Sequence, residues 1–334
     1  MTLEEIEMAC EGGQPLDFSR HELEPPELPL NGVFYPYGFP VEVSTNSAEV
    51  LEMAAELWGR FEKQHDTEPI RSTVYVVEDD STACPPAPSY RFLFPLMISV
   101  ANGTNYSIVD LERKSAQISI SRAALRHRLY VKYFLLGTPV LCISTLFTTP
   151  IHAACVAWKG RGVLLCGDSG AGKSSLSYAS ARAGWTYISD DATLLLNGGT
   201  ERRVIGDCHW VRLRPTATTL FPELQGLEIT PRAAGKPSIE MPTTSLPNMI
   251  CSETTTVDFI VFLNRRDSGQ PQLIPYCKDV ARYFMQQVLI GSAETRAVQY
   301  RAIDRLLAVD VFEMRYTEMD WAIKRLQKLV QDGR

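Results

Sequence analysis

The sequence predicts an α/β protein in two parts: a mixed α+β region over residues 1–125 and a phosphate-loop domain over residues 126–334. Three observations support this prediction. A glycine-rich loop lies between an apolar strand pattern and a helix pattern in the second part. Strand and helix patterns continue after it, and the first part holds β-rich runs with one early helix.

The composition is that of an ordinary globular protein. The 334 residues are 45% hydrophobic and 22% charged, enough for two domains with substantial cores. A formal net charge of -6 disfavours nucleic acid as a partner. The eight cysteines show no metal-finger spacing. The N-terminus is acidic and we expect no apolar stretch of membrane-span length, which predicts a cytoplasmic protein without a membrane partner.

The first part shows periodicities of both kinds. The patterns predict, in chain order, a strand or hairpin at 33–43, a helix at 48–61 capped by Ser47, a strand at 72–77 and several strands over 90–120. A helical pattern returns over 124–147, with an interruption at 137–139, and we place the domain border near its start.

The second part alternates between strand and helix. Two short apolar strands, 153–158 and 163–166, precede the glycine-rich loop, and a helix over 173–183 follows it. The later elements are expected as strands at 186–189 and 257–263, helices at 279–291 and 293–308, a strand at 311–316 and a helix at 318–330.

The loop from Gly167 to Ser174 has the full pattern G-x-x-x-x-G-K-S, which predicts ATP and Mg²⁺ as cofactors. Its backbone N–H groups surround phosphates, Lys173 reaches the outer phosphates and Ser174 binds magnesium. A chance glycine loop is the alternative, and the strand before and the helix after argue against it. The expected nucleotide contacts are Gly167, Asp168, Ser169, Gly170, Ala171, Gly172, Lys173, Ser174 and Ser175.

Two adjacent carboxylates, Asp190 and Asp191, follow the predicted strand at 186–189. Ligands bind at the carboxyl ends of strands in open α/β sheets. One carboxylate near a triphosphate can hold magnesium while the other accepts a proton from an attacking hydroxyl. Taken alone, the pair is more typical of a turn in which aspartates only cap backbone groups.

His152 lies just ahead of the strand that precedes the loop, and a single histidine in such a place is usually structural. Its surroundings point elsewhere. The stretch Thr148-Thr149-x-x-His152, the loop, the helix that ends at Gly184 and the Asp190-Asp191 pair occur in one order over about residues 148–196. In this combination the chain resembles the catalytic domain of the HPr kinase/phosphorylase family.

The resemblance implies a P-loop fold related to phosphoenolpyruvate carboxykinase and a serine kinase activity. It implies that Asp191 takes the proton from the substrate, that Asp190 and Ser174 lie at the magnesium, that Lys173 holds phosphates, and that His152 lies near the transferred group. The chain departs from the family where Ser175 replaces a glutamate, where a later Leu-Glu-x-Arg-Gly motif is missing, and in its first part. It therefore resembles a diverged kinase relative.

A basic stretch follows the aspartates, and Lys236 in its Ala-Ala-Gly-Lys-Pro segment is the residue there most suited to a catalytic lid. The predicted function is ATP-dependent transfer of a phosphoryl group to a serine or similar hydroxyl of a protein or peptide. Two alternatives stay open: a small-molecule hydroxyl as acceptor, and a nucleotide-binding regulatory or scaffold protein. The sequence determines neither the acceptor nor the oligomeric state, and a homo-oligomer is one of the open alternatives.

Overall fold

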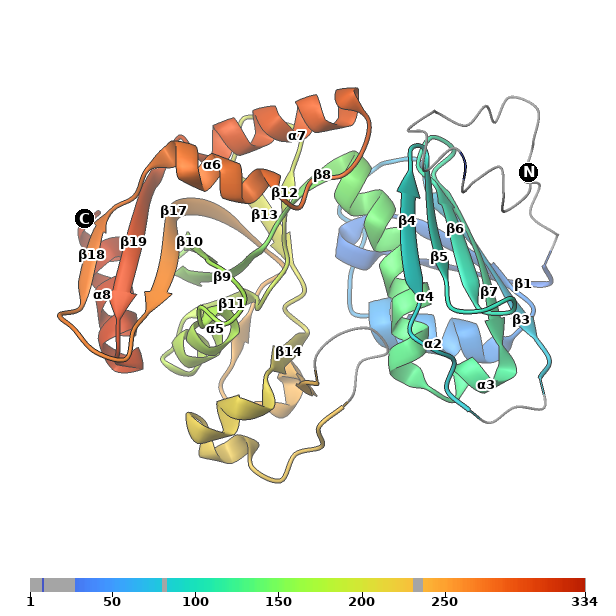
Figure 1. Cartoon of the computed structure of the whole chain (residues 1–334), viewed down its shortest axis with the longest axis horizontal. Helices are drawn as coiled ribbons and strands as arrows, with labels where there is room; N and C mark the ends of the chain where they lie inside the picture. Colours follow the sequence, from blue (N-terminus) through green and yellow to red (C-terminus); the bar gives the residue numbers. More distant parts are fainter. Residues whose placement is uncertain (1–7, 9–27, 80–82, 231–236, 334) are drawn as a thin grey trace. The chain divides into compact units, whose positions relative to one another are not determined.

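The computed structural model describes residues 8, 28–79, 83–230 and 237–333 (Figure 1). The chain is a mixed α/β protein that divides into two compact units, with the main border between Leu146 and Phe147. The two-part α/β class expected from the sequence agrees with this architecture. The acidic N-terminal stretch lies almost wholly outside the described residues.

The first unit is built on a seven-stranded sheet in the order β1-β2-β3-β7-β6-β5-β4. Strands β2, β3 and β7 are parallel to one another and the remaining neighbours are antiparallel. The elements are β1 (Leu30–Phe34), η1 (Pro36–Gly38), β2 (Val41–Thr45), α2 (Ala48–Trp58), β3 (Ile70–Val77), β4 (Ser89–Leu93), β5 (Leu96–Val100), β6 (Tyr106–Asp110), β7 (Ser115–Ser121), α3 (Arg122–Leu125) and α4 (Arg128–Cys142).

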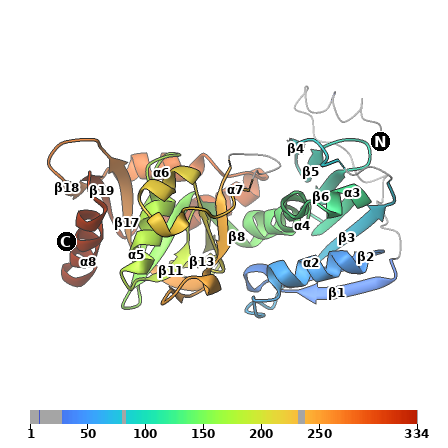
Figure 2. The same ribbon diagram turned by 90° about the horizontal axis from the view of Figure 1, so that it is seen from below.

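One face of this sheet carries the core of the unit. Val43, Val74 and Ile118 are each at most 3% exposed and share the face that α2 and α4 cover. Figure 2 shows α2 beside β1 and β2. Alternate side chains point to opposite faces of a strand, so the apolar alternation in these segments is what directs the helices to one side.

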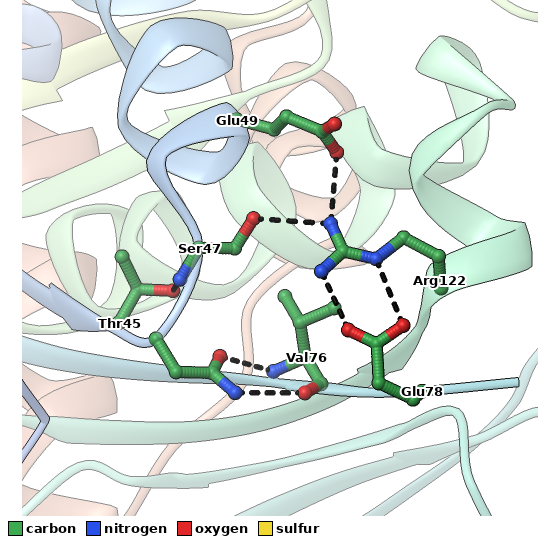
Figure 3. Close-up of polar contacts among 7 residues, drawn as sticks. Thr45, Ser47, Glu49, Val76, Glu78 and Arg122 are labelled. Atoms are coloured by element: carbon green, nitrogen blue, oxygen red, sulfur yellow. Dashed lines mark hydrogen bonds and ion pairs between the residues drawn. The ribbon is translucent and has the colours of Figure 1, made fainter.

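Arg122 joins three elements of the first unit (Figure 3). Its guanidinium bonds Glu78 at the end of β3 at 2.6 Å, Glu49 in α2 at 3.2 Å and the Ser47 hydroxyl at 3.5 Å. Ser47 occupies the N-cap position of α2 as predicted, but its side chain makes no capping bond and accepts from Arg122 instead. The network fixes the start of α2 against the sheet.

Helix α4 differs from the prediction in two ways. The expected interruption at 137–139 is wrong, because the helix runs through Pro139 and continues as a π-helix over Ile143–Phe147. The helix also packs on β3, β6 and β7, so the structure groups it with the first unit. The border between the parts therefore lies at 146/147 instead of 125/126.

The segment Tyr130–Phe147 corrects a second expectation. Among the described residues it is long and apolar enough to cross a membrane, by length and composition alone, whereas we expected no stretch of that length. More than half of it is buried inside the structure. A helix that is buried to this extent against a sheet is typical of the core of a folded domain.

The second unit has a sheet in the order β16-β11-β9-β10-β17-β13-β12-β8, to which β19 and β18 add beside β17, and a separate β14-β15 pair. Strand β17 is parallel to both β10 and β19. The elements are β8 (Thr148–Ile151), β9 (Ala153–Trp158), β10 (Arg161–Cys166), α5 (Lys173–Arg182), β11 (Thr186–Ser189), β12 (Thr193–Leu196), β13 (Arg203–Gly206), β14 (Trp210–Leu213), β15 (Ile239–Pro242), β16 (Ile250–Cys251), β17 (Thr254–Arg265), β18 (Gln272–Pro275), α6 (Lys278–Gln286), α7 (Ala293–Leu306), β19 (Asp310–Tyr316) and α8 (Met319–Asp332).

Helices cover both faces of this sheet. Leu165 and its neighbours on one face pack with α5 and α8, while Leu164 and its neighbours on the other pack with α6 and α7. In Figure 1, α6 and α7 lie above the strands and α5 lies below them. The continuous apolar runs of β10 and β17 follow from this burial on both faces.

Candidate functional site

Three segments of the second unit meet at one edge of the sheet. Strands β10 and β11 end there and strand β9, antiparallel to both, begins there. Cys166, the last residue of β10, pairs with Ala153, and Ser189, the last of β11, pairs with Cys155. The glycine-rich loop, the two aspartates and His152 each lie next to these pairs along the chain, so the register brings them together.

The glycine-rich loop connects β10 directly to α5, as the sequence predicts. Gly172 is the N-cap of α5 with φ 98°, a left-handed conformation that L side chains rarely adopt. A Cβ atom at this position would lie 2.8 Å from the Tyr316 hydroxyl. The first N–H groups of a helix have no partner within the helix, and the helix dipole adds positive potential there. The geometry suits an anion.

Lys173 is 5% exposed, and its ammonium lies inside the loop. Its Nζ donates to the carbonyl oxygens of Gly167 at 2.8 Å and Asp168 at 3.3 Å, and lies 3.0 Å from His152 Nε2. Burial lowers the pKa of the ammonium, and the negative charge of Asp191 opposes that change.

His152 connects Lys173 to Asp191. Its Nδ1 lies 3.5 Å from Asp191 Oδ1, and its pKa is lowered, chiefly by burial and further by Lys173, against the effect of Asp191. A neutral imidazole has one N–H donor and one acceptor nitrogen, and an ammonium can only donate. We therefore assign the proton to Nδ1, which points it toward the Asp191 carboxylate.

The two aspartates have different environments. Asp190 is 6% exposed and its Oδ2 accepts the backbone N–H of Arg212 at 2.8 Å. Burial raises the pKa of Asp190 to about 6, against the opposing charge of Arg212. The side chain of Asp191 is 57% exposed. The exposed carboxylate is accessible to an acceptor, and the buried one lies beside Ser174, whose hydroxyl donates to the Asp190 carbonyl oxygen at 3.2 Å.

The residues at this edge fit magnesium and a nucleoside triphosphate in kind. No group of three or more His, Cys, Asp and Glu side chains suited to a metal occurs in the described ranges. Magnesium keeps several waters and takes only one or two carboxylates besides substrate phosphates, so Ser174 and Asp190 would be a sufficient protein contribution. The loop N–H groups and Lys173 would supply the phosphate donors.

The remaining predicted residues have separate outcomes. Ser169 and Gly170 are exposed in the loop, and Ser175 is half-buried in the first turn of α5. Lys236 lies outside the described residues. The assignments of residues to ATP and magnesium stay predictions.

Two contacts at the site were not foreseen. Arg212, in the basic stretch after the aspartates, donates its backbone N–H to Asp190 and lowers the pKa of that carboxyl group by its charge, while its guanidinium lies 3.6 Å from Asp207 and 3.9 Å from Glu240. Tyr316, whose hydroxyl lies 3.4 Å from the Ala171 carbonyl oxygen, ends strand β19. The sequence places Tyr316 at the carboxyl end of a predicted strand, where ligands bind in α/β sheets, and this position could have identified it as a residue of the site.

Comparisons with known proteins give distant matches. The family model described as SynChlorMet cassette protein ScmC matches residues 138–229, a segment that contains His152, the glycine-rich loop and both aspartates. Among solved structures, the Hpr(Ser) kinase/phosphatase from Coxiella burnetii matches with 14% identity and a TM-score of 0.34, over 56% of this chain and 96% of that one. No curated protein sequence matches.

Proposed function

We propose that this chain is an ATP- and magnesium-dependent kinase that transfers the γ-phosphoryl group to a serine, or a similar hydroxyl, of a peptide or protein. The proposal places its second unit in the phosphoenolpyruvate carboxykinase/HPr kinase-like class of P-loop folds and its activity in the cytoplasm. The observation that supports the proposal most is the environment of the Asp191 side chain. This carboxylate is 57% exposed and joined through His152 to the lysine of the glycine-rich loop.

The proposed roles follow from the contacts. The loop N–H groups and Lys173 hold the phosphates, while Ser174 and Asp190 hold magnesium, which neutralises charge on the transferred group. Asp191 accepts the proton of the acceptor hydroxyl. The oxygen of that hydroxyl forms the new bond to the γ-phosphorus, and the bond from the γ-phosphorus to ADP breaks. The Nδ1–H of His152 orients the carboxylate for that proton transfer.

The name of the matched family, SynChlorMet cassette protein ScmC, refers to a cassette. We therefore propose that the acceptor is a product of a gene beside the one that encodes this chain. Neighbour-encoded peptides and proteins are the first acceptors to test with γ-labelled ATP. A panel of small hydroxylated metabolites is the second set of acceptors to test. If only a metabolite is labelled, the acceptor is a small molecule and the peptide or protein acceptor is rejected.

An Asp191→Asn variant tests the role of the base. We expect label transfer to fall about a hundredfold or more, because a positioned general base contributes at least that factor, while ATP binding by calorimetry stays unchanged. Asp332→Asn, at an exposed carboxylate at the end of α8, is the matched control and keeps full activity. Undiminished transfer in Asp191→Asn would remove the residue from this role.

A nucleotide-binding regulatory protein is the second candidate. It is favoured by the missing Leu-Glu-x-Arg-Gly motif and by Ser175 in place of the glutamate of the resembled family. This candidate predicts ATP-magnesium binding without ADP formation, with any acceptor or with water. Steady production of ADP that depends on Asp191 would exclude it.

A further inference from the structure

Two cysteines away from the glycine-rich loop, Cys208 and Cys251, lie next to each other in the second unit. Strands β13 and β17 are antiparallel with Ile205 opposite Thr254, and the Gly206 N–H donates to the Glu253 carbonyl oxygen at 2.9 Å. Beyond this bond the first segment turns at Cys208 and His209, and His209 Nε2 lies 3.1 Å from Glu253 Oε1, so the segments that carry Cys208 and Cys251 remain next to each other. Their thiol groups are hydrogen bonded to each other.

We propose that Cys208 and Cys251 form a redox-active dithiol that closes to an intramolecular disulfide by exchange with a low-molecular-weight disulfide. Both cysteines are free thiols in the structure. A disulfide needs the two side chains to point toward each other, and thiols that share a hydrogen bond already do so. The chain segments on either side are joined by the Gly206–Glu253 bond and the His209–Glu253 contact, so the bond can form without a large backbone movement.

The two thiols differ in a way that assigns their roles. Cys251 is exposed, whereas Cys208 is 2% exposed. The hydrogen bond from Cys208 lowers the pKa of Cys251 to about 7, with smaller contributions from Thr243 and His209 and against the effect of burial. The same hydrogen bond raises the pKa of Cys208. Cys251 is therefore the attacking thiolate and Cys208 the resolving thiol.

The exchange proceeds in two balanced steps. The Cys251 thiolate attacks one sulfur of the small disulfide, whose S–S bond breaks and releases one small thiolate. Cys208 then loses its proton and attacks the Cys251 sulfur, which expels the second small thiolate and forms the protein disulfide. The protein loses two electrons and two protons, and the small disulfide is reduced to two thiols.

A second pair of neighbouring cysteines provides an internal comparison. Cys155 in β9 and Cys166 in β10 lie on adjacent strands and are both 0% exposed. Burial raises the pKa of both thiols. A protonated thiol without access to the reagent does not exchange, so this pair stays reduced while the first pair oxidises.

The test is incubation of the full chain with mixtures of reduced and oxidised glutathione at pH 7, followed by acid quenching, alkylation and peptide mapping by mass spectrometry. We expect a Cys208–Cys251 cross-linked peptide, two hydrogen atoms lighter than the reduced pair, whose fraction rises with the proportion of oxidised glutathione. Its rate of formation rises with pH through an inflection near 7, the value of the Cys251 pKa.

Two variants complete the test. Cys208→Ser should stop at the mixed disulfide of Cys251 with glutathione, and Cys277→Ser, which removes another exposed thiol, should cross-link as the wild type does. Circular dichroism and thermal melting confirm that each variant is folded. Wild-type protein that stops at glutathionylated Cys251, or that cross-links only after denaturation, would overturn the proposal.

Discussion

Replacement of Asp190 by asparagine is expected to stabilise the second unit at neutral pH while it weakens the proposed metal site. Burial raises the pKa of this carboxyl group from its ordinary value of 3.8 to about 6. At pH 7 the group is charged in both the folded and the unfolded chain, and a pKa difference of this size corresponds to about 3 kcal/mol of lost folding free energy. Asparagine has the same shape, and its oxygen can still accept the Arg212 N–H.

The pH dependence has a definite sign. Because the folded pKa is the higher one, the folded chain binds more protons than the unfolded chain between pH 3.8 and about 6. The stability that protonated Asp190 contributes is fully present below pH 3.8 and is lost as the pH rises through 6. We expect the variant to lack this decline and to exceed the wild type at pH 7 by up to about 3 kcal/mol.

The measurement is urea unfolding at several pH values from about 4 to 8, followed by tryptophan fluorescence. Trp158 and Trp185, with ring centroids 5.5 Å apart in the core of the second unit, report on this unit. The control is Asp191→Asn, whose exposed carboxylate predicts a change within about 0.5 kcal/mol. An Asp190→Asn variant that is less stable than the wild type at pH 7, with an unchanged pH slope, would refute this account of its burial.

Three further outcomes follow from the contacts. Lys173→Met should weaken ATP-magnesium binding about ten- to a hundredfold by calorimetry, since a charge-assisted bond contributes about 1.5–3 kcal/mol. Gly172→Ala should destabilise the second unit by about 1–2 kcal/mol more than Gly199→Ala in urea unfolding, because both positions have positive φ but only the first places a Cβ 2.8 Å from Tyr316. Arg122→Gln should lower the melting temperature of the first unit slightly, and 1 M salt should largely remove the difference, since the network is partly exposed.

Sequence patterns predicted the local elements around the site well. Strands β9, β10 and β11 and helix α5 begin and end within about two residues of the expected positions. Apolar alternation, loop glycines and the helix-ending Gly184 are all local signals, which explains this accuracy. The meeting of three segments at one edge was also predictable, because carboxyl ends of strands gather ligand groups in α/β sheets.

The features that the sequence did not predict depend on contacts between distant parts of the chain. Proline usually interrupts a helix because it removes one backbone donor, but α4 is held along its length by the sheet of the first unit, and this packing outweighs the loss. The sequence patterns did not predict strands β12 and β13, which have four residues each. The Arg212 N–H that holds Asp190 comes from a position 22 residues away, and no spacing rule predicts such a bond.

Lys173 is the residue that relates phosphate binding to the proposed base. An ammonium has three donors, and here they face His152, the Gly167 carbonyl and the Asp168 carbonyl. A phosphate oxygen that bonds this ammonium must replace one of these partners. If the phosphate oxygen replaced His152 as the partner of Lys173, the imidazole would lose its contact with the positive ammonium and gain a negative phosphate nearby. Both changes raise the pKa of His152. Binding of the nucleotide would thereby strengthen the attraction between His152 and Asp191, so that the base is oriented when the phosphates are in place.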